Sequence, residues 1–410
     1  MSCWETYGKQ IRSFDSFLAK YMAQTRVVIV GGGFGGLSVA TRLLKSVSAE
    51  DVAITIIDSS PMSTYTPWLH NVATQSKGGI AQTDIVLSAI AGVRFRLGTM
   101  DSLDVAGKHV VLLDGTTVPY DICVLAVGSV SNDFGISGVE EFSLPMKRTS
   151  DAQRIQQKLR DLIAKPSKTP RRVVIVGAGP NGVELAAESA AMGGNALEVI
   201  LVDSHPDLLS FFSPFLQKRT MNRLVSLGVV LQLKSMLAKV SKDSVVFRPM
   251  VNGVPTDEEK TVACDLCIVA LGVKTPDVIL QLPFVKNVQG RVFVDSSLRV
   301  LDRDDIFVLG DCAAMNRDTI PDPKTAQAAV RQSKTVAQNI CAMITQQPLV
   351  QYIPKKRWDV LVTLDGARAV GTALGIPVWG YTAGVFRKFA DAHYFFLVLP
   401  WRDALRRILS

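Results

Sequence analysis

The stretch VVIVGGGFGG, residues 27–36, decides how the beginning of this chain folds. Four β-branched residues precede the glycines, and a largely apolar segment, residues 37–44, follows them. This order predicts a buried strand, a tight turn and a helix. Gly31, Gly33 and Gly36 fit the spacing G-x-G-x-x-G, which permits the turn, a close approach to a pyrophosphate and close helix packing. The stretch therefore predicts a dinucleotide site at a helix N-terminus, where free N–H groups favour negative charge.

An acidic residue follows at the position that such a site requires. Residues 53–57 are typical of a second strand, and Asp58 comes directly after it. A carboxylate there can accept hydrogen bonds from a ribose. The alternative is a glycine-rich turn that binds no ligand, but the order of strand, turn, helix and acid favours the nucleotide.

The same pattern occurs a second time further along the chain. Residues 173–182 read VVIVGAGPNG, and Asp203 follows the next predicted strand. A later pair, YDICVLAVG at 120–128 and CDLCIVALG at 264–272, repeats at nearly the same separation. Two matched pairs predict an α/β protein with two Rossmann-like dinucleotide-binding domains. The glycines of the second copy are Gly177, Gly179 and Gly182.

One pair of residues indicates that the first domain is discontinuous. Gly310 and Asp311 lie beyond the second repeat, so we expect the chain to return to the first domain after the second has been inserted. The predicted parts are an N-terminal extension (1–25), the first domain (26–145 and 290–350), the inserted second domain (146–289) and a C-terminal membrane-association or dimerisation region (351–410).

Composition narrows the class of protein. The chain has 410 residues, 48% of them hydrophobic, and a net charge of +8. We find no apolar run of the roughly 18–20 residues that a membrane-spanning helix needs, which predicts a soluble or peripheral protein. Six cysteines are too few for a disulfide scaffold. Cys264 and Cys267 form a C-x-x-C within a predicted strand, where their side chains point to opposite faces, so we expect buried thiols and no metal site.

The C-terminal residues PWRDALRRILS predict an interfacial helix. Trp401, Leu405 and either Ile408 or Leu409 fall on one helical face, and the arginines Arg402, Arg406 and Arg407 fall largely elsewhere. An apolar face flanked by arginines and aromatic residues suits an anionic bilayer surface. The alternative is a helix that packs on its own core or on a second subunit.

Seven segments carry a resemblance to a known family: GGGFGG (31–36), YTPWLHNVAT (65–74), AVGSVSNDFG (126–135), MKRTSDAQRI (146–155), VGAGPNGVELAAE (176–188), LGDCA (309–313) and PKTAQAAVRQ (323–332). With these, the sequence resembles the two-dinucleotide-binding flavoprotein superfamily. Within it, the chain is similar to the type II NADH dehydrogenases, single-subunit NADH:quinone oxidoreductases of the respiratory chain that do not pump protons.

The resemblance implies that the first site holds FAD and the second holds NADH. Asp58 would bind the adenosine ribose of FAD, and Asp311 its ribityl chain. The predicted helix 325–344 would direct its N-terminus at the isoalloxazine ring. The FAD residues would be Gly31, Gly33, Phe34, Gly35, Gly36, Asp58, Gly128, Asp311, Ala326 and Gln327. Those for NADH would be Gly177, Gly179, Pro180, Asn181, Gly182, Glu184, Asp203 and Gly272.

The implied catalytic residues are Glu184, Gln327 and Arg331. Glu184 would lie near the nicotinamide and the flavin, although a carboxylate on the first turn of a helix also suits the dipole as a plain capping charge. Arg331 stands where the family pattern A-Q-x-A-x-Q has its second glutamine. Its guanidinium could donate hydrogen bonds to a quinone carbonyl, or it could be a solvated residue that makes an ion pair.

The choice of nucleotide depends on Asp203, because a carboxylate repels a 2′-phosphate and so favours NADH over NADPH. Ser204 and His205 follow it and could soften that preference.

The resemblance implies a membrane quinone as partner, reached through peripheral contact of the C-terminal region. The location would be the mitochondrial inner membrane in a eukaryote or the plasma membrane in a bacterium. A homodimer is an open alternative for the tail, and we expect no nucleic-acid partner. Two other functions stay open: a soluble NAD(P)H flavoreductase with a protein or oxygen acceptor, and a redox-signalling flavoprotein similar to apoptosis-inducing factor.

Overall fold

The computed structural model describes residues 24–74, 83–315 and 322–409. Contacts divide the chain into two units. The first comprises Met1–Ser63, Val86–Ser129 and Thr275–Pro354, and the second comprises Thr64–Ile85, Val130–Lys274 and Lys355–Ser410. The short strands β3 (Met62–Thr64) and β4 (Asp84–Val86) fall at boundaries between these ranges. No helix in the described part of the chain is long and apolar enough to cross a membrane.

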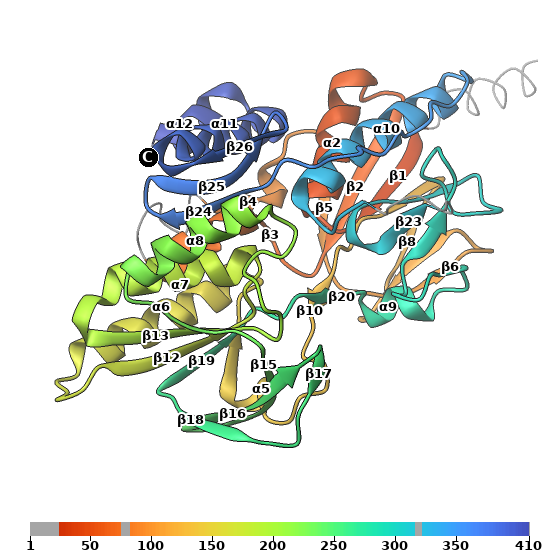
Figure 1. Ribbon diagram of the computed structural model, residues 1–410. Coiled ribbons are helices and arrows are strands. Elements are labelled where there is room, and N and C mark those ends of the chain that lie inside the picture. Colours follow the sequence, from red (N-terminus) through yellow and green to blue (C-terminus); the bar gives the residue numbers. More distant parts are fainter. Residues whose placement is uncertain (1–23, 75–82, 316–321, 410) are drawn as a thin grey trace, which may run out of the picture. The chain divides into compact units, whose positions relative to one another are not determined.

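The first unit is built on a parallel five-stranded sheet with the order β22-β9-β1-β2-β5. The strands are β1 (Thr25–Val30), β2 (Val52–Asp58), β5 (Val93–Leu97), β9 (Ile122–Leu125) and β22 (Ile306–Val308). Residues Val27–Val30 of β1 and all of β9 are apolar and buried, as expected for a parallel sheet covered on both faces. Two helices, α2 (Phe34–Ser46) and α10 (Ala326–Ile344), pack along each other (Figure 1).

Smaller elements complete this unit. An antiparallel sheet contains β6 (Met100–Asp104), β7 (His109–Leu112) and β8 (Thr117–Pro119), and α9 (Asp277–Gln281) packs against β6. Two short strands, β21 (Val292–Val294) and β23 (Ala313–Met315), pair in parallel. The turn η2 (Leu87–Ala89) precedes β5, and η4 (Gly310–Cys312) follows β22.

The second unit repeats the same architecture. Its parallel sheet has the order β11-β19-β12-β13-β14, made of β11 (Ser143–Pro145), β19 (Leu266–Val269), β12 (Arg171–Val176), β13 (Leu197–Val202) and β14 (Val230–Gln232). The helices around it are α3 (Leu69–Thr74), α6 (Thr149–Ala164), α7 (Pro180–Gly193) and α8 (Pro214–Ser226). The predicted α/β fold with two Rossmann-like domains is confirmed, since the order β9-β1-β2 in one unit corresponds to β19-β12-β13 in the other.

Antiparallel elements decorate the second unit. One sheet holds β15 (Ser235–Ser241), β16 (Ser244–Val251), β17 (Val254–Pro255) and β18 (Lys260–Ala263), and β10 (Val130–Ser131) pairs with β20 (Val273–Lys274). Short helical pieces are η1 (Thr66–Trp68), α5 (Val139–Phe142) and η3 (Gly194–Ala196).

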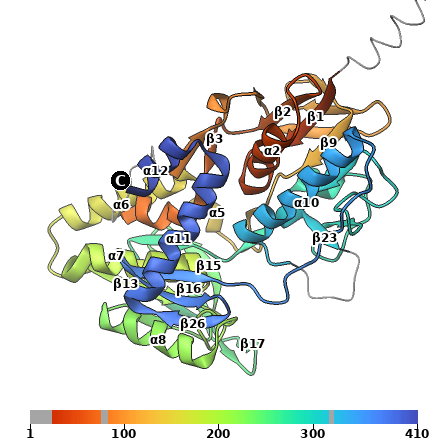
Figure 2. The ribbon, with the colours of Figure 1, turned by 90° about the horizontal axis from the view of Figure 1, so that it is seen from above.

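The C-terminal residues form a hairpin sheet and two helices. The sheet contains β24 (Leu361–Asp365), β25 (Arg368–Ala373) and β26 (Ile376–Trp379). The helix α11 (Gly380–Val398) packs on β25, and α12 (Trp401–Leu409) packs on α11 (Figure 2).

The predicted domain boundaries differ from the two units at residues 64–85, 130–145 and 355–410, which belong to the second unit, and at 275–289, which belong to the first. The physical reason for the larger shifts is apolar packing. Leu69 and Val72 of α3, together with Val362 and Leu364 of β24, are buried in one hydrophobic cluster with the core of the second sheet. Most of the predicted N-terminal extension, residues 1–23, lies outside the described residues.

Candidate dinucleotide sites

The first cradle is formed by the turn between β1 and α2. Gly31 has φ +103°, and a Cβ atom there would lie 2.3 Å from the Ala126 carbonyl oxygen, so no other residue fits. A Cβ on Gly36 would lie 1.9 Å from the Gly31 carbonyl oxygen. A Cβ on Gly33 would meet no described atom within 4 Å. The outer glycines therefore pack helix on strand, and the middle glycine opens the space that a pyrophosphate needs.

Asp58 ends β2 beside this turn. Its carboxylate accepts hydrogen bonds from the Gly32 N–H at 2.7 Å and from the Ser60 N–H at 2.8 Å. These bonds fix the carboxylate against the glycine loop. An ionised carboxylate has about four lone-pair directions, so Asp58 keeps acceptor capacity for a ribose hydroxyl.

Asp311 lies in η4, directly after β22. The Ser129 hydroxyl donates to Asp311 Oδ2 at 2.5 Å, and the Gly310 N–H donates to Gln332 Oε1 of α10 at 2.6 Å. The helix α10 begins after Thr325, whose side chain accepts from the Ala328 N–H. The first unit therefore holds the turn η4, which contains Asp311, against α10.

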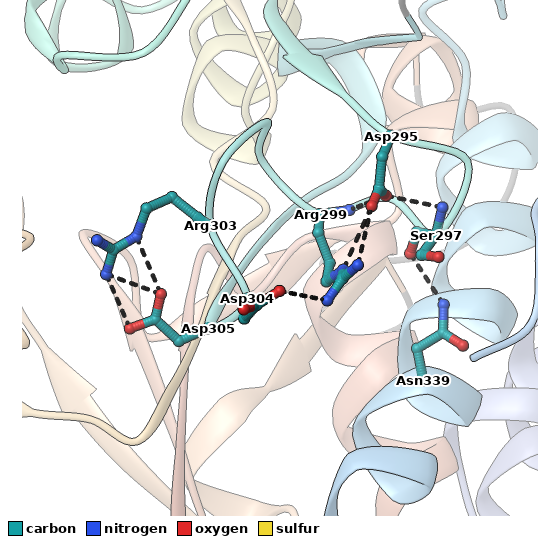
Figure 3. A network of polar contacts seen from close by, with 7 residues as sticks. All are labelled: Asp295, Ser297, Arg299, Arg303, Asp304, Asp305 and Asn339. Atoms are coloured by element: carbon teal, nitrogen blue, oxygen red, sulfur yellow. Dashed lines mark hydrogen bonds and ion pairs between the residues drawn. The ribbon is translucent and has the colours of Figure 1, made fainter. Parts of the chain in front are cut away.

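A polar network holds the segment that leads to Asp311 (Figure 3). Arg299 donates to Asp295 and to Asp304, the latter at 2.7 Å. Arg303 donates to both carboxylate oxygens of Asp305, the residue before β22. Asn339 of α10 donates to the Ser297 carbonyl oxygen at 2.9 Å. The bond from Asn339 ties the segment that precedes β22 to α10, and the arginine contacts hold that segment together.

The second cradle has the same construction. Gly177 has φ +109°, and its Cβ would lie 2.4 Å from the Ala270 carbonyl oxygen. A Cβ on Gly182 would lie 1.8 Å from the Gly177 carbonyl oxygen, whereas one on Gly179 would meet no described atom within 4 Å. Gly272, with φ +104°, follows β19 and also has open space at its Cβ position.

Asp203 has one more partner than Asp58. Its carboxylate accepts from the Ala178 N–H at 2.6 Å and from the His205 N–H at 2.8 Å, and the His205 Nδ1 lies 2.9 Å from the Oδ1 atom. The two cradles therefore share their glycines and their carboxylate and differ in this imidazole.

One protein family matches most of this chain. The family model described as pyridine nucleotide-disulphide oxidoreductase matches residues 25–333. The chain belongs to the pyridine nucleotide-disulphide oxidoreductase family. It is therefore an oxidoreductase, and FAD and NADH are the cofactors implied for it, which the two cradles fit.

Relatives confirm the resemblance to type II NADH dehydrogenases. The chain is similar to the type II NADH:quinone oxidoreductase of Staphylococcus saprophyticus, with 26% identity covering 92% of this chain and 96% of the relative. It is also similar to demethylphylloquinone reductase NdbB of Synechocystis, with 28% identity covering 93% of this chain and 94% of the relative. Both relatives align over almost their whole length.

Solved structures show the same fold. The structure of NDH2 from Plasmodium falciparum in complex with NADH matches with a TM-score of 0.82 at 18% identity, covering 94% of this chain and 97% of that chain. The sulfide:quinone oxidoreductase from Aquifex aeolicus matches with a TM-score of 0.76 at 21% identity, covering 91% of each chain.

In this member of the family, Glu184 is buried inside the second unit. It lies in the second turn of α7, so the expected capping role on the first turn is wrong. Its carboxylate lies 3.3 Å from His70 Nδ1 and 3.7 Å from Arg387 Nη1, and it accepts from the Thr363 N–H at 3.0 Å. Burial alone would raise the pKa of Glu184, but the imidazole, the guanidinium and the N–H hold that pKa below its ordinary value.

This cluster continues to a second carboxylate. Arg387 Nε lies 3.3 Å from Asp391, which accepts from the Tyr65 hydroxyl at 2.7 Å and from the Trp68 indole N–H at 3.0 Å. Ion pairs and hydrogen bonds thereby join the segment 65–70 to α7 and α11. On the sequence alone the YTPWLHNVAT segment is only a family marker. The ion cluster was not predicted from this segment, because a local sequence pattern does not indicate partners that lie hundreds of residues away in the chain.

Gln327 and Arg331 both lie on α10, one turn apart, and both are exposed. Arg331 Nη2 donates to the Ile353 carbonyl oxygen at 3.2 Å, and its guanidinium lies 6.0 Å from the centre of the Tyr352 ring. The next residue, Gln332, is buried and was not singled out from the sequence. Its amide accepts from the Gly310 N–H and donates to Asp322 at 2.9 Å.

The cysteines form no metal or disulfide centre among the described residues. Cys264 and Cys267 are buried and free, and burial raises the pKa of the Cys264 thiol to about 11 and that of Cys267 further. The expectation that one strand carries both is wrong, because Cys267 lies on β19 whereas Cys264 precedes that strand; both thiols are nevertheless buried, as expected.

Proposed function

We propose that this protein is a FAD-dependent oxidoreductase that takes a hydride from NADH and passes two electrons to a membrane quinone, without pumping protons. The observation that carries the proposal is the pair of glycine cradles of one construction, in a chain whose relatives named type II NADH:quinone oxidoreductase align over almost its whole length. When bound, the flavin supplies the redox chemistry, accepting the hydride and releasing electrons.

In this proposal the first unit binds FAD. The loop from Gly31 to Gly36 holds the pyrophosphate with its N–H groups, and Asp58 holds the adenosine ribose. Asp311, fixed by the Ser129 hydroxyl, accepts from the ribityl chain. The N–H groups of Ala326 and Gln327 open α10, and the positive end of its dipole favours negative charge at the flavin.

The second unit binds NADH in the same manner. The loop from Gly177 to Gly182 holds its pyrophosphate and Asp203 its adenosine ribose. We assign Glu184 to the nicotinamide side of this unit as a positioning residue. Its carboxylate joins α7 to α3 and α11, and so holds in place the helix that opens the site.

We assign the quinone side to Gln327 and Arg331. Both side chains are exposed, and they lie one turn apart on α10. The bond from Arg331 to the Ile353 carbonyl uses one of the five N–H donors of a guanidinium and orients the others. A donor-only group can hold a quinone oxygen while negative charge develops on it.

An exposed apolar surface on α11 and α12 supports contact with a membrane. On α12, Trp401 and Leu409 are 62% and 81% exposed, and Leu405 lies between them on the same face. The inner face carries Ala404, which is buried, and Arg407, which donates to the Asp84 carbonyl oxygen at 2.8 Å. Arg407 therefore packs on the protein, whereas Arg402 and Arg406 are exposed. The exposed apolar residues of α11 are Tyr381, Val385, Phe386, Phe389 and Phe396.

The redox proposal is tested by anaerobic spectroscopy of the purified protein. We expect a yellow protein that NADH bleaches and that a soluble quinone recolours. Bleaching without recolouring by any quinone would overturn the quinone assignment in favour of a protein acceptor. A protein that binds no flavin would overturn the whole proposal.

A further inference from the structure

We propose that Asp322 is a positioning residue that orders two parts of the first unit at once, the turn that carries Asp311 and the segment that holds Arg331. It acts on the turn through Gln332 and on the segment through Tyr352. The inference rests on the proposed function, in which Asp311 serves the flavin and Arg331 the quinone. It gives a role to three buried polar side chains that the proposed reaction leaves unused.

These three side chains meet at one carboxylate oxygen. Asp322, Gln332 and Tyr352 are 8%, 2% and 3% exposed. The Gln332 amide and the Tyr352 hydroxyl both donate to Asp322 Oδ2, at 2.9 Å and 2.6 Å. Burial and the neighbouring carboxylate raise the pKa of Tyr352, so its hydroxyl keeps its proton and donates. A single oxygen therefore anchors a side chain of α10 and a side chain that follows that helix.

The backbone of Asp322 is itself held in place. Arg291, which is 3% exposed, donates from both terminal nitrogens to the Asp322 carbonyl oxygen, at 3.3 Å and 3.4 Å. The Arg291 N–H donates to Asn287 Oδ1 at 3.0 Å. Arg291 comes directly before β21, which pairs with β23, the strand that follows η4. The carboxylate of Asp322 is therefore fixed relative to the strands beside the turn.

Asp322 decides which way the Gln332 amide points. The oxygen and the nitrogen of an amide have nearly the same shape, so their neighbours select the orientation. The Gly310 N–H donates to Gln332 Oε1 at 2.6 Å, and the amide nitrogen is then directed at the acceptor Asp322. Gly310 has φ +73°, and the carboxylate of the next residue, Asp311, accepts from Ser129. Without Asp322 the amide could turn its nitrogen toward the Gly310 N–H, and the turn would lose its acceptor.

The second arm reaches Arg331. The Arg331 guanidinium lies 6.0 Å from the centre of the Tyr352 ring, within the range of a cation–π contact, and donates to the Ile353 carbonyl oxygen at 3.2 Å. The Tyr352 N–H donates to the Ser296 carbonyl oxygen at 2.7 Å. The backbone of this segment is thus held at Ser296 and its ring at Asp322. Removing the bond to Asp322 frees the ring that lies against the guanidinium.

The test measures two quantities on the full-length flavin-loaded protein. The FAD dissociation constant comes from the fluorescence of flavin released on dilution, and the quinone KM comes from steady-state turnover with a soluble quinone. Gln332→Met keeps the size of the side chain and leaves the Gly310 N–H without its acceptor, so we expect FAD to bind about tenfold more weakly. Tyr352→Phe should raise the quinone KM several-fold. Asp322→Leu should produce both effects.

Two further variants separate positioning from a general loss of stability. Asp322→Asn keeps an acceptor oxygen for both donors, so it should recover most of what Asp322→Leu loses. Ser333→Ala removes a buried hydrogen bond of the same helix, from the hydroxyl to the Val330 carbonyl oxygen at 2.7 Å. We expect this control to change neither the FAD dissociation constant nor the quinone KM. Thermal unfolding of each variant shows that it folds.

The inference is overturned if Gln332→Met binds FAD as tightly as the wild type does, or if Asp322→Asn loses as much as Asp322→Leu. Should Asp322→Leu fail to fold, Gln332→Met and Tyr352→Phe decide the two arms separately. A wild type that binds no FAD is a different result, because it would overturn the proposed function itself. A wild type that binds FAD but reduces no quinone would overturn the quinone assignment, and FAD release would still decide the arm through Gln332.

Discussion

The Nδ1 atom of His70 lies 3.3 Å from a carboxylate oxygen of Glu184, and the two side chains are 2% and 5% exposed. The same carboxylate has Arg387 at 3.7 Å and the Thr363 N–H at 3.0 Å. Burying an ionised carboxylate is costly unless partners of opposite charge and hydrogen-bond donors surround it. Glu184 meets that condition with groups from three separate parts of the chain. Glu184 therefore stabilises the fold of the second unit, whatever its role at the nucleotide site.

We expect Glu184→Gln to lower the free energy of unfolding by about 3 kcal/mol, because the largely buried Arg387 guanidinium then keeps only part of its counter-charge, from Asp391. The measurement is denaturant unfolding of the purified protein. Glu188→Gln is the matched control, since Glu188 lies one turn further along α7, is 3% exposed and accepts from the Gly366 N–H. The ion pairs found in the described residues do not include Glu188, so its variant should lose less. Equal losses in the two variants would contradict the role of the ion cluster.

The same cluster makes a prediction about pH. The pKa of Glu184 is held below its ordinary value in the folded protein. Its stabilising contribution is therefore complete above the unfolded value, about 4.3, and is lost as the pH falls through the lower folded value. We expect the stability difference between the wild type and Glu184→Gln to shrink below about pH 4. Unfolding free energies of both proteins from about pH 7 to pH 3 test this, and a difference that stays constant would count against it.

Two glycines of the first cradle should respond differently to alanine. Gly33→Ala adds a Cβ that meets no described atom within 4 Å, so the protein should fold and lose FAD affinity, since the Cβ enters the pyrophosphate space. Gly31→Ala, with φ +103° and a Cβ 2.3 Å from Ala126, should impair folding itself. Flavin absorbance and thermal unfolding separate the two effects. Full flavin content in folded Gly33→Ala would refute the assignment of this loop.

Arg331→Gln should raise the quinone KM several-fold while leaving flavin reduction by NADH unchanged, because it replaces a charged donor on the proposed quinone side. Stopped-flow reduction and steady-state quinone kinetics measure the two steps. Lys334→Gln removes an exposed charge from the same helix and serves as the control. Unchanged quinone kinetics in Arg331→Gln would mean that this arginine only holds the Ile353 carbonyl oxygen.

Substituting Trp401→Asp and Leu405→Asp together should weaken binding to anionic lipid vesicles by about tenfold or more. Both side chains are exposed, so the substitutions should change stability by no more than about 0.5 kcal/mol each. Vesicle co-sedimentation provides the measurement, and Val288→Asp, an exposed apolar residue of the first unit, provides the control. If the double variant binds vesicles as well as the wild type but loses self-association in ultracentrifugation, the surface is a subunit interface instead.

The sequence predicted the parts of each site that depend on short-range geometry. The cradles at Gly31 and Gly177 need a positive φ and room for a neighbouring carbonyl, and glycine alone provides both. The carboxylates of Asp58 and Asp203 follow their first glycines at nearly the same distance along the chain, because each copy is built from the same order of turn, helix and strand. Such features repeat wherever the local construction repeats, so one chain containing two copies reveals both.

By itself, then, the sequence determined two dinucleotide cradles, their order and the α/β architecture that carries them. Only the tertiary structure decided which unit receives residues 64–85 and 355–410, that Glu184 is enclosed by His70 and Arg387, and that Arg331 is held by a backbone carbonyl. The reason is physical. A glycine turn is specified by sterics within a few residues, whereas a buried charge is specified by partners that only the folded chain brings together.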